Sequence, residues 1–342
     1  MKEYDIQILV ASQQPVYVPP VKNLALIQAG TALAEERLEG MLHDDIGAHI
    51  SEKNKLYCEL TVQYWAWKNL KADYYGFFHY RRYMNFSEEY PVGKNGKLRA
   101  CRWTPYIERD SISSDLSEFG LDEPHIQEVT AKYDLLTVLS ERMNVTVYQQ
   151  FCQFHDRRSL DLAIAIVKRR YPGYAGACDA YMHSKYIYFC NMYIMKRSIF
   201  YAYMEWLFPI LEQFESEWDA SRMGGNENRV IGYIAERLFG VYYTELKLQN
   251  RIRCCELPYV IFYDTWSAKG MSDGKIRSAG QMSSVKTDAG RHKAARPSAR
   301  SRMRTFYIGR RKIQVDMRKV NAALPAGSLR RRAVRTVMGR FL

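Results

Sequence analysis

The sequence predicts an α/β fold in which a sheet is layered with helices. The first observation is a set of apolar runs with the length of buried strands, at residues 6–12, 74–78, 133–139 and 187–195. The second is helical spacing between and after these runs, which reaches residues 70, 170, 218 and 243. Because strands alternate with helices along the chain, the pattern indicates a layered α/β sheet, and no internal repeat interrupts it.

The first strand, residues 6–12, ends in an extended turn that contains three prolines. A helical patch is predicted at residues 31–42. Ser51 or Asn54 can cap the N-terminus of the next helix, which runs to about residue 70. Its large apolar residues recur at helical spacing: Tyr57, Leu60, Tyr64 and Trp67.

The strand at residues 74–78 leads directly into His79, Tyr80, Arg81 and Arg82. Charged residues at the carboxyl end of a buried strand stand where open α/β sheets bind their ligands. Residues 88–124 are polar and irregular, so a loop insertion over the cleft is expected there.

The second half continues the alternation. A helical region follows the strand at 133–139, and residues 172–186 are predicted to be a loop. The next strand, 187–195, is interrupted by Asn191. Helices are then predicted from Ser198 to about Trp218 and over residues 228–243.

The charge is divided unevenly between body and tail. The chain has 342 residues and a net charge of +13, and from Ala268 onward 20 Lys and Arg stand against three acids. The tail therefore carries +17 and the first 267 residues carry −4. We expect a catalytic-type domain at 1–267, a flexible basic linker at 268–304 and a basic amphipathic tail at 305–342.

The end of the tail interleaves apolar and basic residues: Leu329, Val334, Val337, Met338, Phe341 and Leu342 with Arg330, Arg331, Arg332, Arg335 and Arg340. A helix with this pattern can lie on an anionic membrane surface. The alternatives are a solvated tail without a partner and a nucleic-acid partner. The sequence has no helix-turn-helix, zinc-finger or RNA-binding signature for the latter.

The cysteines indicate a cytosolic protein, and the basic tail is expected to bring it to the inner face of the membrane. The seven cysteines match no zinc or CxxC pattern, which favours free thiols in a reducing compartment. No apolar run is long enough to span a bilayer, and the first residues have no secretory-signal pattern.

The adjacent Arg81 and Arg82 are the sharpest chemical feature. Two arginines at a strand end can bind phosphate oxygens, and Lys55 near a helix start could extend the positive patch. A departing diphosphate needs that charge neutralisation. The alternative is a surface salt bridge. Lys55 and Glu59 are also expected to be i,i+4 neighbours on one helix.

No Asp-x-Asp sequence, the usual metal-holding signature of single-sheet sugar transferases, occurs in the chain. The arginine pair is therefore expected to replace a metal, and no metal ligands are assigned. Asp44 and Asp45 leave Mg²⁺ or Mn²⁺ open as a cofactor, and a plain turn is the alternative for that pair.

If a group were transferred from such a diphosphate to a hydroxyl, that acceptor hydroxyl would also need a base. The candidates are Asp45, Asp134, His155 and Glu236, with Glu236 first. Asp134 and His155 have structural roles as alternatives, and Glu236 could be an ion pair with Arg237. The sequence has no Gly-rich phosphate loop, G-x-S-x-G or HExxH motif.

Taken together, several strings resemble one family. They are DDIGAHISEKNKLYCELTVQYWAWKNL, DYYGFFHYRRYM, YDLLTV, CNMYIMKRSIFYAYMEWLF and NRVIGYIAERLF. In this order they resemble the family catalogued as domain of unknown function 4422, over about residues 4–265. Ala48 and His49 depart from the family, whose loop often carries Asp-Asn at these positions. The basic tail lies outside the resemblance.

The resemblance implies a bacterial-type glycosyltransferase of capsule, exopolysaccharide or O-antigen synthesis with a GT-A-like fold. Some members are galactofuranosyltransferases, which implies a UDP-galactofuranose donor and a lipid-linked glycan acceptor. The matching positions are Ser51, Glu52, Lys53, Asn54, Glu59, His79, Arg81, Arg82, Asn191, Arg229, Glu236 and Arg237. Of these, Asn54, Glu59, His79, Asn191 and Arg229 are expected at the donor with the arginine pair and Lys55. A non-catalytic glycan- or membrane-binding scaffold of the same fold is the alternative.

Overall fold

The computed structural model describes residues 3–92, 105–113, 115–218 and 229–265, together with the backbone of two strands, Met303–Ile308 (β14) and Arg311–Asp316 (β15). These two strands pair antiparallel and belong to a second compact unit, which also includes Glu108–Asp110. They occupy the start of the tail predicted at 305–342. The linker up to residue 302 and the amphipathic segment at 329–342 lie outside the described residues.

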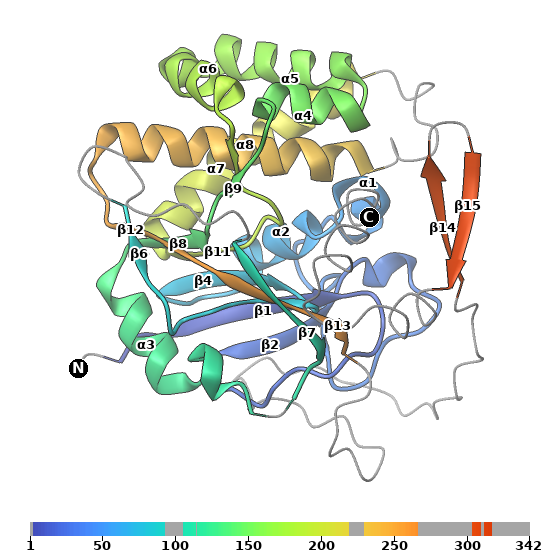
Figure 1. Cartoon of the computed structure of the whole chain (residues 1–342), viewed down its shortest axis with the longest axis vertical. Coiled ribbons are helices and arrows are strands. Elements are labelled where there is room, and N and C mark those ends of the chain that lie inside the picture. Colours follow the sequence, from blue (N-terminus) through green and yellow to red (C-terminus); the bar gives the residue numbers. More distant parts are fainter. Residues whose placement is uncertain are drawn as a thin grey trace. The chain divides into compact units, whose positions relative to one another are not determined.

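One sheet forms the centre of the body (Figure 1). Its main path runs in the order β3-β2-β1-β4-β11-β8-β12-β6. These strands are β1 (Ile6–Ser12), β2 (Leu24–Gln28), β3 (Leu42–His43), β4 (Tyr74–His79), β6 (Tyr90–Pro91), β8 (Leu135–Val138), β11 (Tyr193–Lys196) and β12 (Cys254–Leu257). The prediction of an α/β sheet is confirmed.

Strand directions place the carboxyl ends of six described strands at one edge. β1, β2, β3 and β4 are parallel, and β8 is parallel to β12. β11 runs antiparallel to both β4 and β8, so β8 points the same way as β4. The residues that precede β11 therefore lie at the same edge as the residues that follow β1, β4 and β8.

Smaller strands extend the sheet beyond this path. β5 (Arg82–Met84) folds back on β4, and β13 (Tyr259–Asp264) pairs with β5 and with β7 (Tyr106–Ser111). β9 (Glu141–Arg142) and β10 (Tyr186–Ile187) form a separate short pair.

Eight described helices cover the sheet: α1 (Asn54–Tyr57), α2 (Leu60–Asn69), α3 (Glu123–Lys132), α4 (Val147–Phe154), α5 (Arg157–Arg170), α6 (Ala175–His183), α7 (Arg197–Glu217) and α8 (Val230–Gln249). α7 packs on β4 and β11, and α5 and α6 pack on α7 and α8 as an outer layer. α3 covers the other face (Figure 1). A capping box of Thr146 and Gln149 begins α4.

Successive side chains of β4 point to opposite faces of the sheet, so this strand packs against the helices on both sides. Tyr75 stacks on Phe200 of α7, with ring centroids 4.5 Å apart. Tyr74 and Phe78 point to the opposite face, into the cluster that includes Ile126 of α3. Gly76 lies between them, where a Cβ atom would stand 2.8 Å from Ile8 and clash. The fully buried run of the sequence is thus a central strand packed on both faces.

Two predicted segments are wrong in type. Residues 31–42 are not helical beyond a single 3₁₀ turn, Thr31–Leu33, because residues 34–39 are mostly exposed and have no apolar face to bury. The loop predicted at 172–186 instead contains α6. Its buried residues Ala177, Cys178, Tyr181 and Met182 follow helical spacing, a signal that sequence reasoning missed.

The predicted loop insertion at 88–124 is also corrected for its described part. Ile112, Leu116, Phe119 and Leu121 are buried in the core on the α3 side of the sheet. The segment therefore supplies core residues, and polar neighbours hid them from the sequence pattern.

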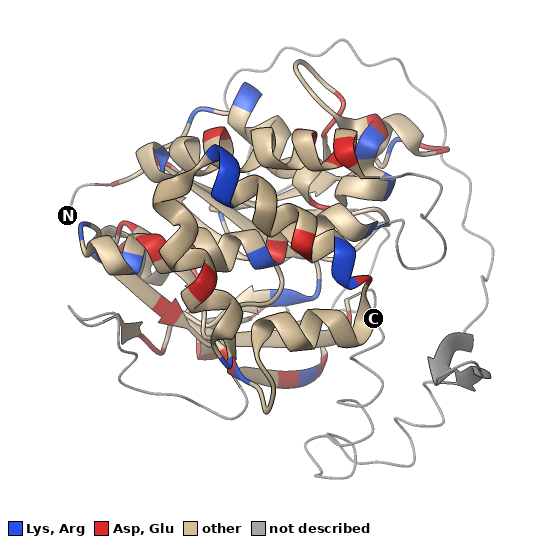
Figure 2. Cartoon of the chain, turned by 90° about the horizontal axis from the view of Figure 1, so that it is seen from above, with Lys and Arg blue, Asp and Glu red and all other residues tan. Residues whose placement is uncertain are grey.

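Acidic and basic residues are interspersed over the described helices (Figure 2). This agrees with the small net charge of the first 267 residues, since the large basic excess begins only at Ala268. Within the described part of the chain, no helix has the length and apolar character needed to cross a bilayer.

Candidate functional site

The candidate site lies where the ends of β4, β5 and β11 meet the start of α8. His79 ends β4 and pairs with Arg82 at the start of β5, so Tyr80 and Arg81 form a tight turn between them. The His79 Nδ1 atom accepts a hydrogen bond of 3.3 Å from the backbone N–H of Arg81. The sequence-predicted cluster of His79, Arg81 and Arg82 is thus built by one strand reversal.

His79 is held neutral. Burial lowers the pKa of its imidazole well below the ordinary value, and the positive charges of Arg82, Arg81 and Arg229 lower it further. Three arginines therefore lie close enough to His79 to affect its pKa, although Arg229 is remote in sequence.

In the described part of the chain, Arg82 has a guanidinium without a bonded partner. Its pKa is raised, first by Cys190 and then by Tyr259 and Glu236, against the opposing effect of burial. Among the described residues, no side chain or carbonyl makes a hydrogen bond or ion pair with its guanidinium. The five N–H donors of this guanidinium are therefore able to bind an anion.

The turn before β11 donates to two carboxylates. The Cys190 N–H binds Glu236 Oε1 at 2.8 Å, and the Asn191 Nδ2 atom binds Glu59 Oε1 at 2.9 Å. Both turn residues have left-handed backbones, with φ of 83° and 48°. Strained backbone at non-glycine residues costs energy and gathers at functional sites. The single strand predicted at 187–195 is therefore wrong, and its interruption at Asn191 is this turn.

A third strained residue, Cys58, splits the helix predicted from residue 51 to 70. Its φ of 53° and ψ of −133° lie in a region that favours glycine, and they separate α1 from α2. The break ends the expected i,i+4 relation of Lys55 and Glu59 and leaves Lys55 exposed on α1. Glu59 instead stands at the start of α2 and faces Asn191.

The start of α8 closes the site. The Arg229 Nε atom donates to Cys58 Sγ at 3.3 Å, and its guanidinium lies 5.7 Å from the Tyr233 ring centroid. Tyr233 stacks on His155 with centroids 4.2 Å apart. Burial and the charge of Arg237 lower the pKa of His155 to about 4, so the imidazole is neutral at pH 7.

Glu236 forms the ion pair with Arg237 that the sequence left open. Arg237 Nη1 lies 3.1 Å from Glu236 Oε2, and its Nη2 atom donates to Gln150 Oε1 at 2.6 Å. The Arg237 side chain is 2% exposed and that of Glu236 18%. Glu236 therefore uses both carboxylate oxygens to hold the Cys190 turn and a buried arginine.

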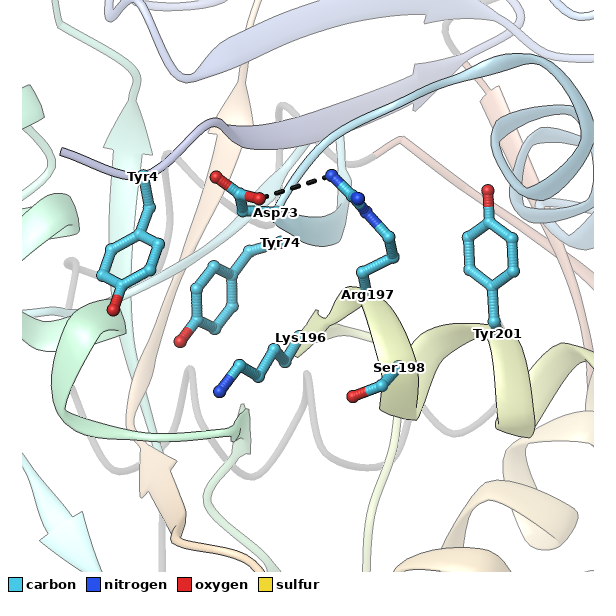
Figure 3. A pocket seen from close by; sticks show the side chains of 7 residues that line it. All are labelled: Tyr4, Asp73, Tyr74, Lys196, Arg197, Ser198 and Tyr201. Carbon is cyan, nitrogen blue, oxygen red and sulfur yellow. Dashed lines mark hydrogen bonds and ion pairs between the residues drawn. The ribbon is translucent and has the colours of Figure 1, made fainter. Parts of the chain in front are cut away.

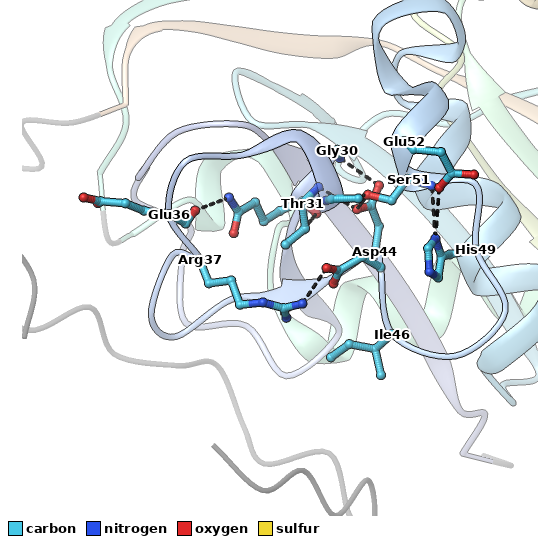
Figure 4. A network of polar contacts seen from close by, with 12 residues as sticks. Gly30, Thr31, Glu36, Arg37, Asp44, Ile46, His49, Ser51 and Glu52 are labelled. Carbon is cyan, nitrogen blue, oxygen red and sulfur yellow. Dashed lines mark hydrogen bonds and ion pairs between the residues drawn. The ribbon is translucent and has the colours of Figure 1, made fainter. Parts of the chain in front are cut away.

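Asp44 has a structural role (Figure 4). Its buried carboxylate accepts hydrogen bonds from the backbone N–H groups of Gly30 and Thr31 and from the hydroxyls of Ser51 and Thr61. With four donors satisfied, it has little capacity left for a metal ion.

Asp45 forms an ion pair with Arg37. The plain-turn alternative thus fits this Asp pair better than a cation site. Within the described ranges, no group of three His, Cys, Asp or Glu side chains could hold a metal.

The neighbouring string Ser51-Glu52-Lys53-Asn54 is likewise occupied. Glu52 pairs with His49, and Lys53 with Glu215 at 2.8 Å. The Asn54 amide accepts from Gln13 and donates to the Cys58 carbonyl at 2.7 Å and to Thr61. The string anchors the loop that carries Cys58 and Glu59, so its contribution to the site is indirect.

Asp134 lies at the wrong edge for catalysis. It precedes β8, so it stands opposite the carboxyl ends of the parallel strands. Its carboxylate accepts from the Arg253 N–H at 2.9 Å and pairs with Lys196 at 3.4 Å. Its candidacy as a base is therefore corrected to a structural role.

A surface pocket also lies away from the cluster (Figure 3). It is lined by Tyr4, Asp73, Tyr74, Lys196, Arg197, Ser198 and Tyr201, at the starts of β4 and α7. Arg197 is paired there with Asp73 at 3.3 Å. Lys196 is paired with Asp134, so both cations of this pocket have a carboxylate partner.

Sequence reasoning named Glu59, His79, Arg82, Asn191, Arg229 and Glu236, and these six meet in the structure. It missed Cys58, Cys190 and Tyr233 as members of the site. No sequence signal marks a left-handed backbone at a cysteine, and Tyr233 was one tyrosine among 26. His155 joins the site through its stacking on Tyr233 and not as an exposed base.

Comparisons with known proteins bear on the fold and on the family of the chain. The structure of the bifunctional glycosyltransferase WbbM in its apo form matches with a TM-score of 0.69 and 30% sequence identity, over 79% of this chain and 48% of that one. The chain thus spans about half the length of WbbM. No curated protein matches at a significant level. The model of the family described as "Domain of unknown function (DUF4422)" matches residues 7–248, and the chain belongs to that family.

Proposed function

We propose that this protein is a glycosyltransferase that moves a sugar from a nucleotide diphosphate to a hydroxyl group of a glycan. The observation that carries the proposal is Arg82, which pairs with His79 at the carboxyl edge of the sheet, lies within the electrostatic range of Glu236 and has no guanidinium partner among the described residues. The likeness to the glycosyltransferase WbbM supports the same reaction class.

The arginines would neutralise the leaving group. Rupture of the bond between the anomeric carbon and the diphosphate oxygen leaves the electron pair on the diphosphate, whose negative charge grows in the transition state. Arg82 offers free N–H donors for it, and Arg81 and Arg229 add positive potential. The low pKa of His79 keeps its imidazole neutral, so it can donate one hydrogen bond without adding charge.

The acceptor side would lie at the carboxylates. Formation of the new bond from the acceptor oxygen to the anomeric carbon releases the hydroxyl proton, which must pass to a base. Glu59 and Glu236 are held side by side by the Cys190–Asn191 turn and are the carboxylates of this cluster.

The finer assignments come from the family resemblance and from the tail. The donor we propose is a UDP-sugar, with galactofuranose as the sugar, and the acceptor is a lipid-linked glycan of capsule, exopolysaccharide or O-antigen synthesis. The basic tail would hold the enzyme at the inner membrane face, where such acceptors are anchored.

Titration of UDP into the protein by calorimetry tests whether Arg82 binds the diphosphate of the donor. We expect Arg82→Ala to weaken binding about 10- to 100-fold, since a hydrogen bond to a charged group contributes about 1.5–3 kcal/mol. Each titration is run with and without Mg²⁺. Arg170→Ala, which removes an exposed arginine at the end of α5, is the matched control and should bind like the wild type.

Two outcomes would contradict the proposal. Equal UDP affinity in wild type and Arg82→Ala would remove the arginine from the donor site. Absence of UDP binding and of UDP-sugar hydrolysis in the wild type would favour a non-catalytic glycan- or membrane-binding scaffold.

A further inference from the structure

We propose that Glu59 is the base that takes the acceptor proton, and that Glu236 is a positioning residue which holds the Cys190–Asn191 turn. This inference rests on the proposed glycosyl transfer and assigns a different role to each of the two carboxylates of the site. It reverses the order that the sequence favours, in which Glu236 comes first.

The hydrogen bonds distinguish the two groups. Glu236 gives one oxygen to the Cys190 N–H at 2.8 Å and the other to Arg237 at 3.1 Å. Glu59 accepts from one side chain, Asn191, at its Oε1 atom, and no described side chain donates to its Oε2 atom. A carboxylate with an open oxygen can receive a proton, whereas one that is saturated by an N–H and a guanidinium is a poor acceptor.

The electrostatic environment of Glu59 favours the same assignment. Burial raises the pKa of Glu59, and the negative charge of Glu236 raises it further. The Asn191 hydrogen bond, a hydrogen bond from the backbone of Glu59 itself and the Arg229 charge lower the pKa, but they do not overcome these effects. A raised pKa makes a carboxylate a stronger base, which brings it closer to the operating pH.

Groups on three elements face Glu59. α8 contributes Arg229, Tyr233 and Glu236, the residues around the start of β11 contribute Cys190 and Tyr193, and the helix break contributes Cys58. Arg229 is the one cation in this set. The charge of Glu59 is therefore tuned mainly by one cation and one anion on the same helix.

The backbone explains why Glu59 can reach the site. Had the helix continued through Cys58, Glu59 would have followed the turn of α1. The left-handed φ of 53° at Cys58 redirects the chain, and Glu59 begins α2 against the Asn191 turn. Three strained residues, Cys58, Cys190 and Asn191, thus serve to bring two carboxylates together, which is an arrangement expected of a preorganised site.

The reaction then balances in one displacement. The acceptor oxygen attacks the anomeric carbon, its proton passes to Glu59, and the diphosphate departs with the electron pair of the broken bond. A single attack from the face opposite the leaving group inverts the anomeric configuration. Inversion, read by NMR of the product, is therefore a consequence of the proposal.

The first experiment compares Glu59→Gln, Glu59→Asp and Glu205→Gln in the full-length protein. Glu205 is an exposed glutamate on α7 and serves as the matched control. We expect Glu59→Gln to lower kcat for sugar transfer roughly 10²- to 10⁴-fold, the range of a lost general base. Its affinity for UDP should stay at the wild-type value, and Glu59→Asp should recover part of kcat.

This design separates the two proposals. If wild type neither binds UDP nor turns over a UDP-sugar, the proposed function fails. If wild type transfers sugar and Glu59→Gln transfers it equally well, only the assignment of Glu59 fails. Retention of configuration, or a sugar covalently attached to Glu59 in mass spectra, would also overturn the role as a base.

The second experiment uses Glu236 as an electrostatic reporter. The acidic limb of the kcat profile of the wild type should lie above pH 4.5, the ordinary glutamate pKa, because protonation of Glu59 stops the reaction. Glu236→Gln should move that limb to lower pH, since a negative neighbour is removed, and should leave measurable activity. Arg229→Gln should move it to higher pH. An unmoved limb, or complete loss of transfer in Glu236→Gln with UDP binding intact, would assign the base to Glu236 instead.

Discussion

At the scale of single residues, the buried ion pair of Arg237 and Glu236 links the stability of the fold to the geometry of the site. Arg237 is 2% exposed, and its charge is balanced by Glu236 and by the amide oxygen of Gln150. A buried charge that loses its partner is strongly destabilising, while replacement of the whole pair by apolar groups is often neutral. The pair therefore affects folding and positioning together.

We predict that Glu236→Leu lowers the free energy of unfolding by about 3–5 kcal/mol, because it leaves Arg237 buried without its counter-charge. The double variant Glu236→Leu, Arg237→Leu should recover most of that loss. Urea denaturation followed by circular dichroism measures both. A double variant that is less stable than the single one would contradict this account of the pair.

At the scale of elements, close contact between α8 and the helix break positions Glu59. Gly232 of α8 lies beneath Cys58, and a Cβ atom at Gly232 would stand 3.0 Å from Cys58 Sγ and 3.3 Å from its Cβ. The approach needs glycine because the neighbour is a strained residue that cannot easily move. The positions of the turn and of the break are thus coupled through one glycine.

We predict that Gly232→Ala lowers stability by about 1–3 kcal/mol through overpacking and lowers the rate of sugar transfer. Adding Cys58→Gly should restore both, since it removes the clashing atoms and suits the left-handed backbone. Thermal unfolding and initial rates measure the effects.

Gly176→Ala in α6 is the control for Gly232→Ala. A Cβ atom there meets nothing within 4 Å, so this change should stabilise the helix, by up to about 1 kcal/mol. Wild-type behaviour of Gly232→Ala would mean that the close approach has no consequence.

At the scale of the whole molecule, the uneven distribution of charge assigns membrane binding and UDP binding to different parts of the chain. The body carries −4 and holds the candidate site, whereas the segment from Ala268 onward carries +17. Anionic lipid attracts each basic residue with about 1 kcal/mol, and ionic strength screens this attraction. Binding to membranes should therefore depend on salt, and binding of UDP should not depend on the tail.

We predict that replacing Arg330, Arg331, Arg332, Arg335 and Arg340 with Gln weakens binding to phosphatidylserine-containing vesicles by roughly 10³-fold at low salt. UDP affinity should be unchanged. Vesicle co-sedimentation, with purely zwitterionic vesicles as the control, measures the first effect. Equal sedimentation of both proteins would contradict a membrane role for the tail, and loss of RNA binding instead would indicate a nucleic-acid partner.

The sequence by itself determined the layered α/β sheet and the strand that ends in His79, because burial on both faces leaves an unbroken apolar run. It also determined the residue types of the site, since arginines and glutamates that follow a buried strand or lie on a helix are visible as such. Segments with weak or mixed patterns, such as α6 and residues 112–121, were misassigned where polar residues masked a partial apolar face.

Only the tertiary structure decided which of these residues act together and in which role. Glu59, Asn191 and Glu236 are far apart along the chain, and their meeting depends on left-handed backbone at Cys58, Cys190 and Asn191. Such conformations cost local energy and persist only because the surrounding packing imposes them. No local sequence pattern encodes them, so the contacts that saturate Glu236 and leave Glu59 open could be found only in the folded chain.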